Sequence, residues 1–176
     1  TGYNTDCHAA VRSLGEAVAL PGKRAVIFGS GGAARAIAAG LKREGVALII
    51  LNRTAEKAAQ LAELVGADDA GGLEKTGQTV PSVDIVVNAT SLGMSPDTDR
   101  SVIPGELLHP GLTVFDTVYN PRETRLLNEA RRQGCDVVYG YKMLLYQAAQ
   151  QFELFTGHPA PLAVMETALT KALEER

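Results

Sequence analysis

Cysteine, net charge and long hydrophobic runs are all scarce in this sequence. Its 176 residues include two cysteines, Cys7 and Cys135, which are too few and too far apart for a disulfide framework or a zinc site. We therefore expect two reduced thiols, no metal site and a cytoplasmic protein. Apolar runs such as residues 46–51 are far shorter than the roughly 18 residues that a membrane span requires. The opening is polar and has no basic start, apolar stretch or initiator methionine, so we expect no signal peptide and interpret it as the middle of a longer sequence.

The charge balance excludes two classes of partner. Lys and Arg number 17 against 20 Asp and Glu, which gives a net charge of −3. A nucleic-acid binder needs a basic footprint, and a membrane-surface protein needs a Lys/Arg cluster, so neither partner is predicted. The chain is 45% hydrophobic and 21% charged, as globular proteins are. Its length suits one well-buried domain and is too short for two.

Short, almost wholly apolar runs alternate with longer helical stretches. The predicted strands cover residues 25–28, 47–51, 84–89, 112–118 and 136–139, and the predicted helices cover 32–44, 55–65, 122–133 and 143–156. Strands that are apolar throughout are buried on both faces, as in a parallel sheet covered by helices. The pattern therefore predicts a doubly wound, mostly parallel α/β sheet with helices on both faces.

The remaining segments complete one domain over residues 1–176. The dinucleotide-binding core is expected at 24–157. The segment 1–20 precedes it and contains a helix at 6–18. The final segment, 160–176, contains a helix at 162–174. The secondary-structure pattern is weakest over residues 66–81, where we expect a weak strand near 67–70 and a short helix. Pro121 is expected at a helix start. Within the helix at 143–156, a buried stripe is predicted at Leu144, Ala148, Phe152 and Phe155.

A glycine-rich turn follows the first predicted strand and opens a helix. Gly29, Gly31 and Ala34 fit G-x-G-x-x-G/A, the Rossmann-like fingerprint in which backbone N–H groups at a helix N-terminus bind a pyrophosphate. The predicted cofactor-binding residues of this turn are Gly29, Ser30, Gly31, Gly32 and Ala33. Gly-rich turns also occur for packing alone, but the position between a clear strand and a clear helix favours a nucleotide site.

The end of the second strand indicates which dinucleotide binds. An NAD site usually has Asp or Glu there, about 20 residues after the turn, to bind the ribose hydroxyls. This strand instead ends in Asn52, Arg53 and Thr54, with Lys57 one helical turn on. A guanidinium, an ammonium and a hydroxyl suit a 2′-phosphate, so the predicted cofactor is NADP. The alternative is that Arg53 and Lys57 are ordinary surface charges and Thr54 is only a helix cap.

Five further motifs, in order along the chain, resemble the shikimate dehydrogenase family. They are Asn-Thr-Asp at 4–6, Asn-Ala-Thr-Ser-Leu-Gly-Met at 88–94, Asp-Thr-Val-Tyr-Asn-Pro at 116–121, Gly-Tyr-Lys-Met-Leu at 140–144 leading to Gln147, and Gln-Phe-Glu-Leu-Phe-Thr-Gly at 151–157. Family members reduce 3-dehydroshikimate to shikimate with NADPH in aromatic amino acid biosynthesis. The resemblance covers only their NADP-binding domain and the hinge-side segment that carries Asn-Thr-Asp. It implies that the N-terminal substrate domain, which carries the catalytic Lys, is missing from this chain.

The resemblance assigns roles by position. Asp6 corresponds to the carboxylate of the catalytic Lys–Asp pair, which grips the substrate hydroxyl during proton transfer. Tyr119 and Gln147 correspond to substrate contacts. The nicotinamide end of the cofactor corresponds to Thr117, Gly140 and Met143. Asn88 and Thr90 end the strand at 84–89, where the ligand crevice of such a sheet lies, and are expected to shape the loop on the nicotinamide side.

Each of these residues also has a plainer interpretation. Asp6 would be a helix cap, Tyr119 and Met143 edges of the core, and Gln147 an exposed helix residue. Lys142 lies beside a cleft motif, but the family pattern does not place the base there, so a solvated side chain is expected. Two other functions stay open: an NADP oxidoreductase domain of the glutamyl-tRNA reductase type, and a non-catalytic NADPH-binding module.

Overall fold

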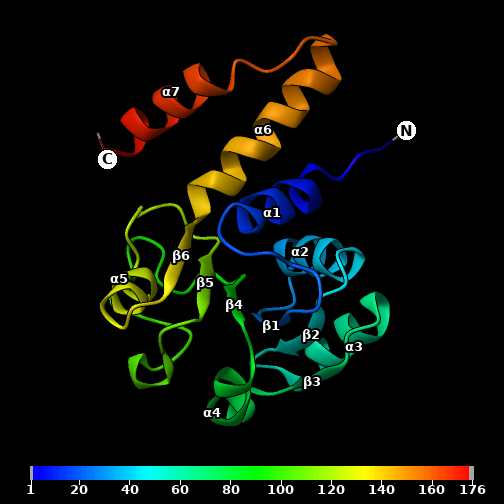
Figure 1. The fold of residues 1–176 in the computed structure, drawn as a ribbon, viewed down its shortest axis with the longest axis vertical. Helices are drawn as coiled ribbons and strands as arrows, with labels where there is room; N and C mark the ends of the chain where they lie inside the picture. The colour runs from blue at the N-terminus through cyan, green and yellow to red at the C-terminus, as the bar shows by residue number, and fades with distance from the viewer. Residues whose placement is uncertain (1, 175–176) are drawn as a thin grey trace.

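The computed structural model describes residues 2–174 and contains, within them, one sheet of six strands in the order β3-β2-β1-β4-β5-β6 (Figure 1). All five neighbouring pairs are parallel. The strands are β1 (Arg24–Phe28), β2 (Ala47–Leu51), β3 (Asp69–Gly71), β4 (Ile85–Asn88), β5 (Thr113–Asp116) and β6 (Asp136–Tyr139). The predicted doubly wound parallel sheet is confirmed. Residues 1 and 175–176, at the ends of the predicted domain, lie outside the described residues.

Helices cover both faces of the sheet. They are α1 (Thr5–Gly15), α2 (Gly32–Arg43), α3 (Ala55–Val65), α4 (Thr76–Thr79), α5 (Arg125–Arg132), α6 (Gly140–Thr156) and α7 (Leu162–Glu174), with 3₁₀ turns at Leu73–Lys75, Val80–Ser82 and Gly105–Leu107. Along β1, Ile27 packs with α1, α2, α3 and α6, whereas its neighbours Val26 and Phe28 pack with α5 and the 3₁₀ segments. Two cores therefore flank the sheet, because successive side chains of a strand point to opposite faces.

Several boundaries differ from those predicted: the helix expected at 6–18 ends at Gly15, and the strand expected at 112–118 covers Thr113–Asp116. The helix expected from 122 begins at Arg125, because Thr124 caps α5 by accepting a hydrogen bond from the N–H of Leu127 at 3.3 Å. Pro121 precedes that cap and follows a cis peptide bond. The helix expected from 143 begins at Gly140, directly at the end of β6. The weak strand expected near 67–70 lies at Asp69–Gly71, and a short helix follows it as predicted.

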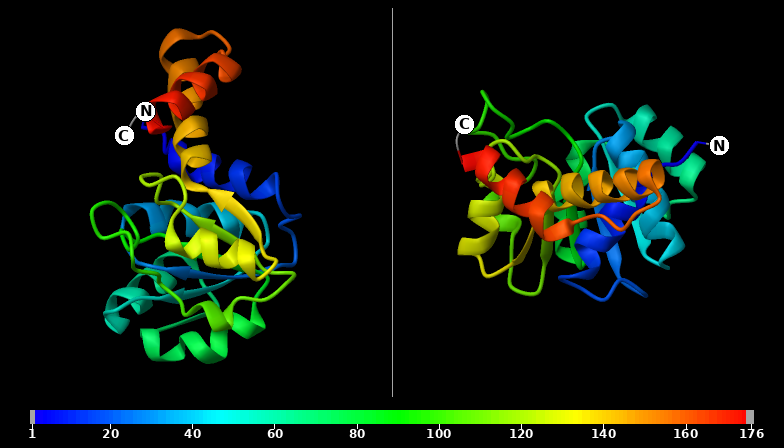
Figure 2. Two further views of the ribbon diagram at one scale, coloured as in Figure 1. Left: turned by 90° about the vertical axis from the view of Figure 1, so that its left-hand side faces the viewer. Right: turned by 90° about the horizontal axis from the view of Figure 1, so that it is seen from above.

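The predicted buried stripe on α6 is wrong. Phe152 is 37% exposed and Phe155 86% exposed, whereas Leu145 and Ala149 are buried. In Figures 1 and 2, α6 rises beyond the edge of the sheet, with α1 beside its first half and α7 folding back along it. The stripe fails because the second half of the helix has no sheet beneath it, and periodicity alone does not show where a sheet ends.

Within residues 2–174, no helix is both long enough and apolar enough to cross a membrane.

Candidate functional site

The turn after β1 crosses the end of β4, and only glycine fits at its first position. Gly29 has a φ of +114°, a conformation that L side chains rarely adopt. A Cβ at Gly29 would lie 2.8 Å from the carbonyl oxygen of Ala89, immediately beyond β4. The first glycine of the motif is therefore required by a close approach of two backbone segments.

The N-terminus of α2 is open toward solvent. Its N-cap residue, Gly31, has no side chain to accept hydrogen bonds from the first-turn N–H groups. A Cβ at Gly31 or Gly32 would meet no protein atom within 4 Å, and both residues are exposed. Free N–H groups and the positive end of the helix dipole favour an anion at this position.

A cavity of about 440 Å³ lies beside this helix start, at the carboxyl ends of β1, β4 and β5. It is lined by six of the predicted residues, Gly31, Gly32, Ala33, Thr90, Thr117 and Tyr119, and by Ala89, Ser91, Met94, Ser95, Val118 and Asn120, which the sequence reasoning did not select. The strand order reverses between β1 and β4. Ligands of open α/β sheets bind in the crevice at such a reversal.

Two buried polar residues, Asn88 and Asp116, hold both walls of this cavity. They end β4 and β5 side by side, and Asn88 Nδ2 donates to Asp116 Oδ1 at 2.9 Å. Asn88 Oδ1 accepts hydrogen bonds from the N–H of Thr90 at 3.0 Å and from its hydroxyl at 2.7 Å. Asp116 accepts from the N–H of Val118 at 3.0 Å and from the hydroxyl of Thr124 at 2.7 Å. One network therefore orders the loops after both strands.

Burial dominates the ionisation of Asp116. Desolvation raises the pKa of its carboxyl to about 6, although the hydrogen bonds from Thr124, Val118 and Asn88 act in the opposite direction. The sequence reasoning did not select Asp116 as a site residue. The available signal was a single carboxylate ending an otherwise apolar strand, because a buried carboxylate requires partners.

The junction of β6 and α6 packs against the second wall. A Cβ at Gly140 would lie 2.4 Å from the carbonyl oxygen of Val118 and 2.6 Å from that of Thr117, so glycine is required here. Met143, one turn further, is 8% exposed and packs in the core shared by α1, α2 and α6. Gly140 and Met143 do not line the 440 Å³ cavity itself.

The turn after β2 carries cations without carboxylate partners. Arg53 and Lys57 are exposed, and neither forms an ion pair with any residue in the described part of the chain. Asn52 Nδ2 donates to the carbonyl oxygen of Thr54 at 3.0 Å. Thr54 is the N-cap residue of α3, but its side chain makes no capping hydrogen bond. Thr54 therefore occupies the cap position that the plainer interpretation gives it, but without a capping hydrogen bond from its side chain.

A second, smaller cavity of about 170 Å³ lies between α2 and α3. Its lining residues are Ser30, Arg35, Lys57, Gln60 and Leu61. The structure thus places two predicted residues, Ser30 and Lys57, beside Arg35, which the sequence reasoning missed. The signal was present, since Arg35 directly follows the last position of the glycine motif.

The start of α1 and the middle of α6 lie side by side. Gln151 Nε2 donates to Gln147 Oε1 at 2.8 Å and to Thr5 Oγ1 at 3.2 Å. Asn4 caps α1, so the interpretation of Asp6 as that cap is wrong, and Asp6 lies half-buried in the first turn. Asp6 and Gln147 are not among the residues that line either cavity described above.

Lys142 takes part in an ion pair that joins three helices. Its Nζ lies 3.1 Å from Glu16 Oε2 and 3.9 Å from Glu166 Oε1, and Tyr146 also donates to Glu16. Partial burial raises the pKa of Glu16, but the hydrogen bonds from Tyr146 and Lys142 lower it overall. Lys142 is partly solvated, with 28% of its side chain exposed, and it also has carboxylate partners because α1 and α7 converge on this part of α6.

Two family models match this chain. The model described as Shikimate / quinate 5-dehydrogenase covers residues 10–100, and the model described as Shikimate 5′-dehydrogenase C-terminal domain covers residues 140–170. The first alone spans more than half of the chain. It includes the glycine turn, the Asn-Arg-Thr segment and Asn88.

Curated relatives agree with the models. Shikimate dehydrogenase (NADP(+)) of Methanosarcina mazei is 44% identical over 98% of this chain, and that of Moorella thermoacetica is 47% identical over 98%. The chain spans 64% and 61% of the lengths of these two relatives.

Solved structures show the same fold. Shikimate 5-dehydrogenase of Thermus thermophilus in complex with NADP(H) and shikimate has a TM-score of 0.87 at 36% identity, covering 98% of this chain and 64% of that chain. Quinate dehydrogenase of Corynebacterium glutamicum in complex with NAD has a TM-score of 0.87 at 33% identity, covering 97% of this chain and 63% of that chain. These matches exclude the glutamyl-tRNA reductase alternative, and the chain belongs to the shikimate/quinate dehydrogenase family.

Proposed function

We propose that this chain is the NADP(H)-binding domain of a shikimate dehydrogenase, which reduces 3-dehydroshikimate to shikimate with NADPH. The observation that carries the cofactor assignment is the pair Arg53 and Lys57 at the end of β2, exposed and without ion-pair partners in residues 2–174. The names of the relatives specify NADP(+), and the Thermus thermophilus structure contains NADP(H) and shikimate.

The cofactor would lie across the carboxyl end of the sheet. The N–H groups at the start of α2, near Gly31 and Ala33, would bind the pyrophosphate, and Asn52, Arg53 and Thr54 would bind the adenosine end with its 2′-phosphate. The 440 Å³ cavity would hold the nicotinamide end. Its walls contain Thr90 and Thr117, and the close packing at Gly140 supports the second wall.

When bound, NADPH supplies the hydride for carbonyl reduction. The chain's own contribution would be to orient the substrate and a proton donor. We assign Asp6 as the carboxylate that accepts a hydrogen bond from the substrate and holds the catalytic Lys of the substrate domain in its ammonium form, ready to protonate the carbonyl oxygen. Tyr119 and Gln147 would contact the hydroxyls or carboxylate of the substrate, one from the cavity wall and one from α6.

A surface on α6 and α7 is suited to the substrate domain. Phe155 is 86% exposed, Val164 68%, Leu154 44% and Phe152 37%. They lie on the part of α6 and α7 that extends beyond the sheet (Figure 2). Large exposed apolar side chains are common at interaction surfaces. Because the relatives are longer than this chain, we propose that a substrate domain covers these residues.

Replacing Arg53 with alanine is expected to weaken NADPH binding by about 1.5–3 kcal/mol, the usual contribution of a charge-assisted hydrogen bond. NADH binding should change little, because NADH lacks the 2′-phosphate. Calorimetric titration of the wild-type and variant chains with both cofactors measures the difference directly. Equal losses for NADPH and NADH would contradict the 2′-phosphate assignment.

Gly31→Val is expected to abolish most NADPH binding while the fold survives. The new side chain would meet no protein atom near its Cβ, so it would occupy the space that the pyrophosphate needs. Circular dichroism and thermal unfolding check the fold, and fluorescence titration checks binding. Unchanged NADPH affinity of the variant would show that the glycine turn serves packing and does not bind the cofactor.

A further inference from the structure

Two helices that begin at the carboxyl edge of the sheet enclose the small cavity beside the glycine turn. Ser30 and Arg35 come from the start of α2, and Lys57 and Gln60 come from the first two turns of α3. At about 170 Å³ the cavity is well below the roughly 300–1,000 Å³ of pockets that bury a whole drug-sized ligand. It therefore suits one group of a larger ligand.

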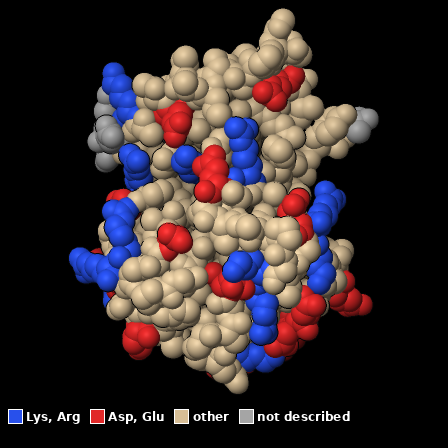
Figure 3. Space-filling model, in the orientation of Figure 1, with Lys and Arg blue, Asp and Glu red and all other residues tan. Residues whose placement is uncertain are grey.

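The two basic residues that line this cavity form no ion pair within the described residues, whereas several lysines elsewhere on the chain do. Lys23, Lys42 and Lys75 each lie 3.0 Å or less from a carboxylate oxygen of an Asp. Arg35 and Lys57 have no such partner among residues 2–174. On the face shown in Figure 3, acidic and basic side chains are intermixed. Two unpaired cations facing one small cavity, near the positive ends of two helices, favour an anion there.

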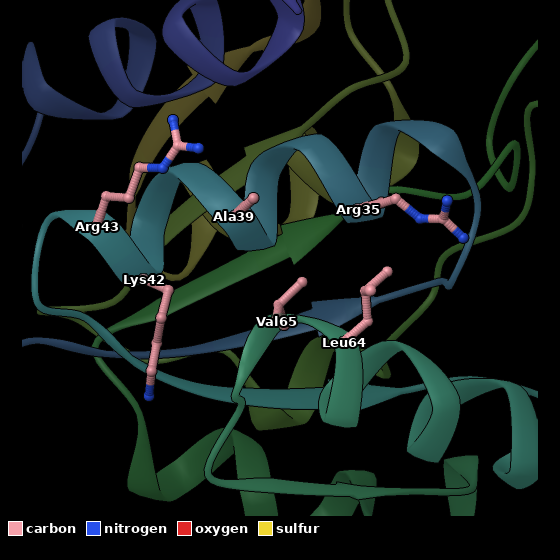
Figure 4. Close-up of a pocket in the computed structure, with 6 residues that line it drawn as sticks. All are labelled: Arg35, Ala39, Lys42, Arg43, Leu64 and Val65. Atoms are coloured by element: carbon pink, nitrogen blue, oxygen red, sulfur yellow. The ribbon is translucent and has the colours of Figure 1, made fainter.

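Of the three basic side chains on α2, Arg35 is the one that borders the small cavity. Figure 4 shows the furrow between α2 and α3, which continues the small cavity toward the far end of the two helices. Arg35 lies at the end near the glycine turn and borders both hollows. Lys42 and Arg43 lie at the other end, where Lys42 pairs with Asp68 at 3.0 Å and Arg43 turns toward α1.

We propose that Arg35 is a specificity-determining residue, and that it clamps the ribose phosphomonoester of the cofactor from the α2 side, opposite Lys57. The phosphate would then lie between two helices, with the hydroxyl of Ser30 as a further donor, and would not be held by the turn after β2 alone. A guanidinium suits this role because it offers several N–H donors in a fixed planar arrangement. The inference rests on the proposed function and deepens its cofactor selectivity.

The test uses adenosine 2′,5′-bisphosphate and 5′-AMP, which differ only in the 2′-phosphate, titrated calorimetrically into the chain. Arg35→Ala is expected to weaken binding of the bisphosphate about 5- to 30-fold and to leave 5′-AMP binding within about twofold. Arg35→Lys should retain part of the preference. Arg43→Ala, which removes the same charge from the other end of the same helix, should change neither affinity.

The outcomes separate this inference from the proposed function. A wild-type chain that does not prefer the bisphosphate over 5′-AMP would overturn both. A preference that Arg53→Ala removes and Arg35→Ala leaves intact would overturn only the role of Arg35. Equal weakening of both probes by Arg35→Ala would show a general electrostatic effect and would also overturn that role.

Discussion

An Asp6→Asn substitution is expected to lower kcat by about 10²–10⁴-fold in a chimera that joins the substrate domain of the Methanosarcina mazei enzyme to this chain. Asparagine keeps the shape of the side chain but removes the charge that would hold the catalytic Lys and grip the substrate hydroxyl. Steady-state rates of 3-dehydroshikimate reduction, compared with those of the unsubstituted chimera, measure the effect. The Kd for NADPH should stay nearly constant, because Asp6 lies outside both cavities assigned to the cofactor.

Two controls distinguish catalysis from helix capping. Asn4→Ala removes the actual cap of α1 and should cost about 1 kcal/mol of stability with turnover largely retained. The chain without a substrate domain should bind NADPH and reduce 3-dehydroshikimate negligibly, because proton transfer and substrate orientation need both parts. Normal turnover of the Asp6→Asn chimera would contradict the role of Asp6, and robust turnover by the chain alone would contradict the need for an external Lys.

Asp116→Ala is expected to lower the free energy of unfolding by about 3–5 kcal/mol at pH 5, where the carboxyl is largely protonated in the folded state, because three hydrogen-bond donors lose their acceptor inside the protein. These donors are Asn88 Nδ2, the N–H of Val118 and the hydroxyl of Thr124. Urea unfolding measures the loss. Since both walls of the 440 Å³ cavity depend on this network, NADPH affinity should fall as well. A variant within about 1 kcal/mol of wild type would show that the network contributes little.

Asp116→Asn tests the same carboxylate through pH. Burial raises the pKa of Asp116 to about 6, above the 3.8 of an unperturbed Asp, so the folded state favours the protonated form. The contribution of this carboxyl to stability is therefore present below about pH 4 and is lost as the pH rises through about 6. Asparagine does not titrate. The stability of the variant relative to wild type should thus improve by about 2–3 kcal/mol between pH 4 and pH 8, and a constant difference would contradict the raised pKa.

Local sequence was sufficient wherever a property depended on neighbouring residues. The apolar strands predicted a parallel sheet because burial on both faces excludes polar side chains. The glycine turn was predictable because its strand and helix adjoin it in the chain. The Asn-Arg-Thr segment was informative because the residues that end β2 are contiguous. Even here the structure added a reason, since the need for glycine at position 29 arises from Ala89, sixty residues away.

Properties that depend on distant segments were missed or mispredicted. Lys142 was expected to be solvated, and its partners Glu16 and Glu166 come from helices at opposite ends of the chain. Phe155 was expected to be buried but is exposed, because α6 extends beyond the edge of the sheet. Only the three-dimensional structure shows where the sheet ends.

The sequence by itself determined the fold class and the position of the glycine turn, and it indicated the preference for NADP. Strand burial, turn geometry and the charges at the end of β2 each depend on about ten consecutive residues. Over such a short segment, the spacing of residues in the sequence predicts where their side chains lie. The tertiary structure alone decided that Asn88 and Asp116 support both walls of the larger cavity, and that Arg35 faces Lys57 across the smaller one. Asn88 and Asp116 end neighbouring strands, whereas Arg35 and Lys57 lie on different helices. The parallel arrangement of the strands brings the members of each pair together at one edge of the sheet.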